Sequence, residues 1–163
     1  MEKHKFTIVL IFSIISNITF AQEYLLKNEE IIFSFETRSK KKIMLAKDKD
    51  ENYIICRYGT LDKIEIEFPE KTQESWGKFS YSYSEINGNI ENALIFRNKD
   101  FEYAIYDCFY IEKRNKFSIG MRIINKNKEV VYLRGKIKSQ KGKLVINDLT
   151  KIWSSVKKRI KDK

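Results

Sequence analysis

Apolar and polar residues alternate along several short segments in the first half of the chain. In KIEIEF (63–68), Ile64, Ile66 and Phe68 would share one face of a strand, opposite a face of lysine and glutamate. The segments with this character are 31–37, 42–47, 52–58 and 63–68. Because few residues connect them, we expect them to be antiparallel neighbours.

The second half continues in the same way. After the stretch 75–89, strand-like segments occupy 92–97, 101–112, 116–124, 130–137 and 143–148. The segment 101–112, FEYAIYDCFYIE, is apolar or aromatic on both faces, which is typical of a central strand. This meander of short strands predicts an all-β antiparallel fold, either a sandwich or an up-and-down barrel.

The stretch SWGKFSYSYSEINGN, residues 75–89, alternates aromatic residues with serines. Phe79, Tyr81 and Tyr83 would share one strand face, and we interpret them as core residues. Trp76 precedes the strand beside a glycine, so we expect it to be exposed in a loop and available for binding. Asn87-Gly88 indicates a tight turn to the next strand.

The pattern changes to a helical period near the end of the chain. Residues 148–161 are expected to form an amphipathic helix with Asp148 as N-cap and an apolar stripe that includes Ile152. Its other face is strongly basic and includes Lys157 and Lys158. One interpretation is a helix that covers the sheet with its charges in solvent; the alternative is contact with an anionic membrane surface or a polyanion.

The first residues read as a signal peptide. A basic start precedes the apolar run FTIVLIFSIISNI, and Thr19-Phe20-Ala21 supplies a small-residue cleavage site. We expect cleavage after Ala21, with a retained anchor as the alternative. The remaining chain, 22–163, is then a single β-rich domain that is secreted or periplasmic.

Charge and composition limit the kinds of catalytic and binding site that this chain can form. The chain has 32 basic and 22 acidic residues, a net charge of +10. Its one histidine, His4, lies in the predicted signal peptide. Without it, a Ser-His-Asp triad, a Cys-His pair or a histidine zinc site cannot be built. We predict no metal and no cofactor, since the glycines are scattered singly and form no phosphate-binding loop.

Cys56 and Cys108 are the two cysteines, and each lies inside a strand-like segment. In an oxidising compartment an even pair favours a disulfide between them. Two buried free thiols are the alternative.

The carboxylates offer weak candidates for catalysis. Glu65 and Glu67 share one strand face, where cross-strand ion pairs with lysines are the simpler interpretation. Asp107 has aromatic neighbours that suggest partial burial, and we expect it to meet Arg57, Lys113 or backbone donors. Arg57 and Tyr58 lie at a strand end before Gly59, and are weak candidates for binding.

Three segments together carry a resemblance. FSFETRSKKKIMLA, YIICRYGTLDKIEIEFPE and SWGKFSYSYS, within residues 33–110, resemble a group of small secreted bacterial β-rich proteins of uncharacterised function. The resemblance implies a secreted β-domain and supplies no catalytic residues.

These observations predict a non-enzymatic binding or inhibitor-type module. Its partner would be an extracytoplasmic protein or an acidic envelope polymer, and nucleic acid is disfavoured because the basic residues do not interleave with the rings. The candidate binding residues are Trp76, Arg57, Tyr58, Lys157 and Lys158. Alternatives are a surface-binding protein held by the basic helix and a small carboxylate-dependent hydrolase.

Overall fold

A computed structural model describes residues 24–111, 116–126, 128–144 and 152. The predicted signal peptide lies outside these residues. So does the predicted helix over 148–161, with Lys157 and Lys158, apart from Ile152, which is buried in the main core. Within the described part, no helix is long and apolar enough to span a membrane.

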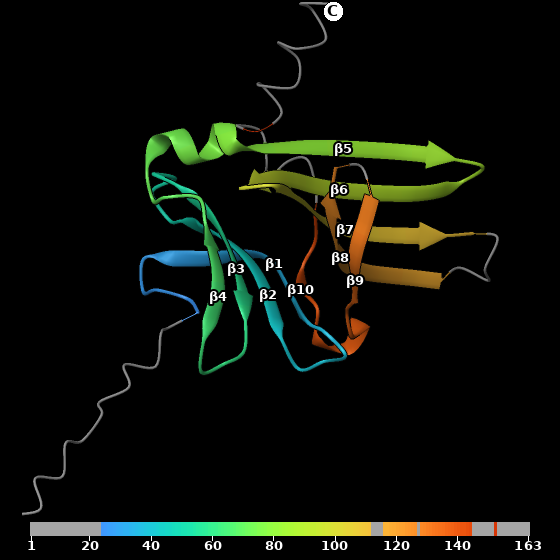
Figure 1. The fold of residues 1–163 in the computed structure, drawn as a ribbon, viewed down its shortest axis with the longest axis horizontal. Helices are drawn as coiled ribbons and strands as arrows, with labels where there is room; N and C mark the ends of the chain where they lie inside the picture. The colour runs from blue at the N-terminus through green and yellow to red at the C-terminus, as the bar shows by residue number, and fades with distance from the viewer. Residues whose placement is uncertain (1–23, 112–115, 127, 145–151, 153–163) are drawn as a thin grey trace, which may run out of the picture.

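The described strands form two antiparallel sheets of five (Figure 1). The first sheet has the order β10-β1-β2-β3-β4. Its strands are β1 (Glu29–Glu36), β2 (Lys42–Asp48), β3 (Ile54–Gly59), β4 (Ile64–Phe68) and β10 (Lys141–Gly142). The predicted antiparallel all-β fold is therefore confirmed, and its architecture is sandwich-like.

The second sheet follows the chain in the order β5-β6-β7-β8-β9. Its strands are β5 (Phe79–Ile86), β6 (Asn89–Asn98), β7 (Phe101–Tyr110), β8 (Lys116–Asn125) and β9 (Lys128–Arg134). The short 3-10 helix η1 (Gln73–Lys78) leads into β5, and η2 (Ile137–Ser139) leads from β9 to β10. Asn87 and Gly88, both with positive φ, form the predicted tight turn between β5 and β6.

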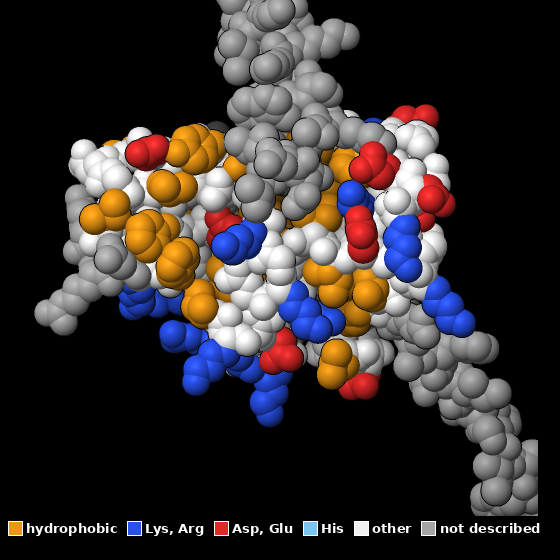
Figure 2. Space-filling view, turned by 180° about the vertical axis from the view of Figure 1, so that it is seen from behind, with side chains coloured by type: hydrophobic (Ala, Val, Ile, Leu, Met, Phe, Trp, Pro, Cys, Tyr) orange, Lys and Arg blue, Asp and Glu red, His pale blue; other side chains and the backbone are white. Residues whose placement is uncertain are grey.

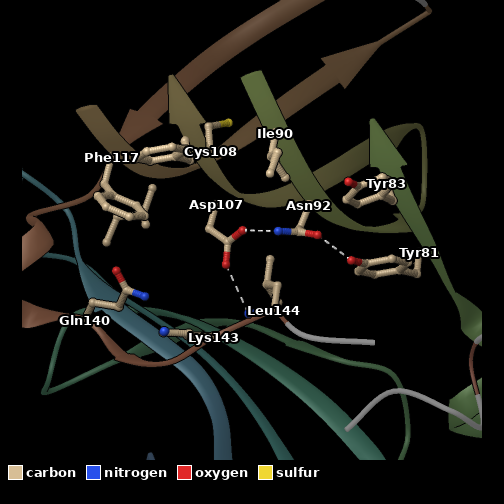
Figure 3. Close-up of a pocket in the computed structure, with 12 residues that line it drawn as sticks. Tyr81, Tyr83, Ile90, Asn92, Asp107, Cys108, Phe117, Gln140, Lys143 and Leu144 are labelled. Atoms are coloured by element: carbon tan, nitrogen blue, oxygen red, sulfur yellow. Dashed lines mark hydrogen bonds between the residues drawn. The ribbon is translucent and has the colours of Figure 1, made fainter. Parts of the chain in front are cut away.

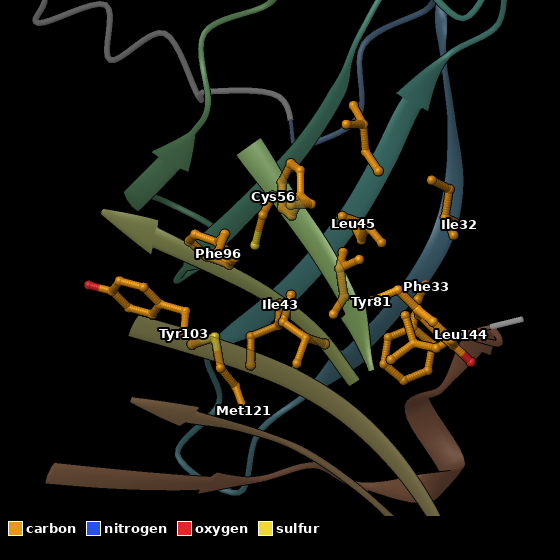
Figure 4. Packing of buried hydrophobic residues seen from close by; sticks show 14 of the residues in the cluster. Ile32, Phe33, Ile43, Leu45, Cys56, Tyr81, Phe96, Tyr103, Met121 and Leu144 are labelled. Carbon is orange, nitrogen blue, oxygen red and sulfur yellow. The ribbon is translucent and has the colours of Figure 1, made fainter. Parts of the chain in front are cut away.

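The core lies between the two sheets (Figure 4). Phe33, Ile43 and Leu45 from the first sheet are fully buried, as is Met121 from the second. The rings of Phe68, Phe96 and Tyr103 stack in series, with centroids 5.0 and 4.9 Å apart, and so join the edge of the first sheet to the second.

At one corner the two sheets are joined by backbone hydrogen bonds. Thr37, after β1, forms a bridge with Gly135, after β9, and the Gly135 amide donates to the Ile119 carbonyl at 2.8 Å. A Cβ on Gly135 would lie 2.6 Å from side-chain atoms of both Ile119 and Phe35. Glycine is therefore required for the close approach at this corner.

Arg57 lies on the outer face of the first sheet, and its side chain is only 1% exposed. Its guanidinium donates to both carboxylate oxygens of Glu29, at 2.6 and 2.8 Å, to Glu67 at 2.6 Å and to the Tyr24 carbonyl at 3.0 Å. Every guanidinium nitrogen is thus engaged. These contacts argue against Arg57 as a binding residue, because its donors tie the N-terminal segment to the sheet.

The Cys56–Cys108 disulfide is also contradicted, because both cysteines are free and buried. Cys56 belongs to the core between the sheets, whereas Cys108 packs with Ala93 and Tyr106 in a separate cluster on the outer face of the second sheet. Burial raises the pKa of each thiol to about 12, so both stay protonated.

We predict that Glu29→Gln lowers the free energy of unfolding by about 3–5 kcal/mol, because it leaves the buried guanidinium without its main counter-charge. The matched control is Glu30→Gln, which removes a carboxylate that is 51% exposed from a pair with Lys47 and should cost about 0–1 kcal/mol. Urea unfolding at neutral pH measures both. Equal effects of the two substitutions would contradict the assignment of Glu29 as the main counter-charge of Arg57.

The same pair predicts an acid dependence. The hydrogen bonds and charge of Arg57 lower the pKa of Glu29 below its ordinary value of 4.5, against the opposing effect of burial. A lowered carboxylate pKa contributes stability above that ordinary value, and the contribution is lost as the pH falls through the lower folded-state value. Wild type should therefore lose more stability than Glu29→Gln between neutral pH and about pH 3.

Candidate functional site

The second sheet is longer than the first along its strands. Strands β6, β7 and β8 have ten residues each, whereas β2, β3 and β4 have seven, six and five. Figure 1 shows the second sheet continuing past the ends of the first. Part of its inner face is therefore not covered by the first sheet.

The strand register divides this inner face into four cross-strand rows. Rows one and two are Phe79–Phe96–Tyr103–Ile123 and Tyr81–Leu94–Ile105–Met121. Rows three and four are Tyr83–Asn92–Asp107–Ile119 and Glu85–Ile90–Phe109–Phe117. Rows one and two pack in the main core against the first sheet.

Exposure rises where the cover ends. In row two Leu94, Ile105 and Met121 are fully buried, but in rows three and four Tyr83 is 48% and Phe117 is 61% exposed. The Phe109 and Phe117 rings contact each other, with centroids 4.7 Å apart. Row four thus brings three apolar side chains, Ile90, Phe109 and Phe117, into contact with solvent, and the exposed Glu85 ends the row.

An open pocket of about 590 Å³ lies over rows three and four (Figure 3). Leu144, after β10, forms part of its wall and is buried. The pocket residues are Tyr81, Tyr83, Ile90, Asn92, Asp107, Cys108, Phe109, Phe117, Ile119, Gln140, Lys143 and Leu144. Most of this lining is aromatic or aliphatic.

A chain of hydrogen bonds crosses the base of the pocket (Figure 3). The Tyr81 hydroxyl donates to Asn92 Oδ1, Asn92 Nδ2 donates to Asp107 Oδ1 at 2.7 Å, and the Leu144 amide donates to Asp107 Oδ2 at 3.1 Å. The chain links β5, β6 and β7 to the segment after β10. It orients the polar groups of row three and fixes one wall of the pocket.

Burial raises the pKa of the Asp107 carboxyl, and the hydrogen bonds from Asn92 and Leu144 and the charge of Lys143 oppose the rise. Of the partners expected for Asp107, the backbone donor is confirmed and Arg57 is wrong, because Arg57 pairs with Glu29 and Glu67. Lys113 lies outside the described residues. Asp107 is therefore a hydrogen-bonded carboxylate at the base of an apolar pocket.

The predicted exposure of Trp76 is wrong. Trp76 is 6% exposed, packs in the main core from η1, and its indole N–H donates to the Glu51 carbonyl at 3.2 Å. Tyr58 is also buried, at 8%, in the same core. Phe79 and Tyr81 are core residues as predicted, whereas Tyr83 is not, because it lies beyond the first sheet.

Glu65 and Glu67 lie in ion pairs, as the alternation predicted. Glu65 pairs with Lys41 at 2.7 Å, and Glu67 pairs with Arg57 at 2.6 Å and Lys71 at 2.9 Å. Among the described residues no group of histidine, cysteine or carboxylate side chains could hold a metal ion.

Sequence reasoning missed the pocket, although two signals pointed to it. The predicted segments that correspond to β7 and β8 are longer than those of the first sheet, and Asp107 lies among aromatic residues.

Comparison with protein-family models, curated proteins and solved structures finds no match for this chain.

We predict that the Asp107 carboxyl titrates above its ordinary value of 3.8 and that Lys143→Gln raises the midpoint further, because it removes a nearby positive charge. Carboxyl-carbon NMR measures the midpoint. Lys49→Gln is the matched control and should leave the midpoint unchanged, because Lys49 follows β2, donates to the Lys27 carbonyl and does not line the pocket. A midpoint below 3.8 would contradict the assigned environment.

The raised pKa of Asp107 determines how its contribution to the free energy of unfolding changes with pH. Asp107 favours the fold most when protonated, and its contribution is lost as the pH rises from the unfolded-state pKa through the folded-state value. This trend is opposite to that of Glu29.

Proposed function

We propose that this chain is an extracytoplasmic, non-enzymatic binding module and that the pocket over rows three and four is its ligand site. The observation that carries the proposal is that Ile90, Phe109 and Phe117, the apolar side chains of row four, stay in contact with solvent. The signal-like sequence at 1–21 supports the extracytoplasmic address.

The size and lining of the pocket support a small ligand. Ligand sites have volumes of about 300–1,000 Å³ and are mostly apolar with a few oriented polar groups. The pocket, at about 590 Å³, has this character, with Asn92 and Asp107 held by hydrogen bonds. The proposal keeps the predicted binding role but moves the binding surface from Trp76 to the long strands.

Binding would be driven by burial of apolar surface. A ligand that lies on Ile90, Phe109 and Phe117 would remove these side chains from water, at about 25 cal/mol for each Å² covered. Covering roughly 200 Å² on the protein and ligand together corresponds to about 5 kcal/mol before the cost of association is subtracted. The site is therefore suited to reversible binding.

The fluorescent apolar probe N-phenyl-1-naphthylamine tests this proposal. We expect saturable fluorescence enhancement with the protein of residues 22–163, and at least about tenfold weaker binding to Phe117→Asp, because a carboxylate at the pocket mouth must be desolvated. Phe117 is 61% exposed, so the substitution should leave the fold intact.

Leu61→Asp is the matched control. Leu61 is 69% exposed in the turn between β3 and β4 and does not line the pocket. Probe binding should match that of wild type, and thermal unfolding should confirm that both variants are folded. No saturable binding, or equal losses in the two variants, would contradict the proposal.

A further inference from the structure

A second cavity, of about 270 Å³, adjoins the pocket and shares Phe117 and Ile119 with it. It exists because β9 pairs with β8 only from Gly120 to Asn125, so the first residues of β8 have no β9 neighbour. The chain then bends at Gly135, whose amide donates to the Ile119 carbonyl. We call this cavity the basic groove.

Three cationic side chains, Arg38, Lys116 and Arg134, line the basic groove, and none of its described lining residues is acidic. Arg38 and Arg134 lie on adjacent backbone segments, because the Arg38 amide donates to the Arg134 carbonyl at 3.2 Å. Within the described part of the chain, Arg38, Lys116 and Arg134 form no salt bridge. The salt bridges of this part are Lys41–Glu65, Lys47–Glu30, Lys47–Glu51, Arg57–Glu29, Arg57–Glu67, Lys71–Glu67, Arg97–Glu102, Arg122–Glu91 and Lys136–Glu36.

The two cavities share Phe117 and Ile119, although the strand register places Lys116 and Arg134 on the outer face of the second sheet, opposite rows three and four. A ligand that uses both cavities therefore passes round the part of the β8 edge that β9 does not pair with. In Figure 2, hydrophobic side chains gather on the side where the second sheet projects, and lysine and arginine side chains gather directly beside them. A ligand that uses both cavities needs an apolar part for the pocket and a negatively charged part for the groove.

The arrangement disfavours ligands with other charges. A cationic head group would be repelled by Arg38, Lys116 and Arg134, while the two oxygens of Asp107 already accept hydrogen bonds from Asn92 and Leu144. A purely hydrophilic anion would leave the exposed Phe117 and row four unused.

We infer that the ligand is an anionic amphiphile, with an alkyl or acyl chain in the pocket over rows three and four and a carboxylate or phosphate head group in the basic groove. This inference rests on the proposed function and adds the chemical class of the ligand. The molecule is taken up as a soluble monomer, since the chain must enter the pocket.

The test compares head groups on one chain length. Dodecyl phosphate, dodecanol and dodecyltrimethylammonium, each below its aggregation threshold, compete with N-phenyl-1-naphthylamine for wild-type protein. We expect dodecyl phosphate to bind at least about tenfold more tightly than the cationic compound, and a tenfold rise in salt to weaken only the binding of dodecyl phosphate.

The triple substitution Arg38→Gln, Lys116→Gln, Arg134→Gln should weaken dodecyl phosphate about tenfold and leave dodecanol unchanged. Arg97→Gln is the matched control. Arg97 is a 79% exposed cation near the end of β6, outside both cavities, and its pairing with Glu102 is exposed. The control should bind all three compounds as wild type does.

The possible failures are distinguishable. Equal binding of the three compounds would overturn the anionic head group while the pocket stands. If none of the three displaces bound N-phenyl-1-naphthylamine, the inference of an amphiphilic ligand is overturned, whereas absence of probe binding would overturn the proposed function itself. Inorganic phosphate that binds as tightly as dodecyl phosphate would show that the chain contributes nothing and would overturn the inference. Binding to vesicles of anionic lipid without binding of monomers would also overturn it.

Discussion

The difference in length between the two sheets is the constraint on which the rest of the account depends. Strands of five to seven residues in β2, β3 and β4 can cover only part of a sheet whose three middle strands have ten. Rows one and two are therefore core, and row four meets solvent although its side chains at Ile90, Phe109 and Phe117 are apolar. Apolar surface that gathers in this way on a folded chain is typical of an interaction site.

Row three lies at the boundary between core and solvent, and its chemistry fits that position. Asn92 and Asp107 are partly buried, so each needs hydrogen-bond partners, and they find them in one another, in Tyr81 and in the Leu144 amide. The same bonds hold the segment after β10 against the sheet. The polar residues of row three therefore mark the boundary of the core and also position one wall of the pocket.

Alternation in the sequence predicted the strands, the antiparallel sheets and the core positions of β5 as far as Tyr81. It could not predict that Tyr83 is exposed, because the extent of cover depends on a sheet formed by distant residues. The burial of Trp76 and Arg57 could not be predicted for the same reason: η1 folds into the core, and the Tyr24 carbonyl of the N-terminal segment accepts a hydrogen bond from Arg57. Cys108 lies on the face of its sheet that is turned away from the core, and strand order alone does not give that relation.

The central claim is that the pocket over rows three and four is a binding surface, whereas rows one and two belong to the core. Intermolecular NOEs from the chain protons of bound dodecyl phosphate test it most directly. The account predicts contacts with Ile90 and Phe117 and none with Leu61. Contacts confined to residues outside the pocket, with a ligand that is demonstrably bound, would contradict it.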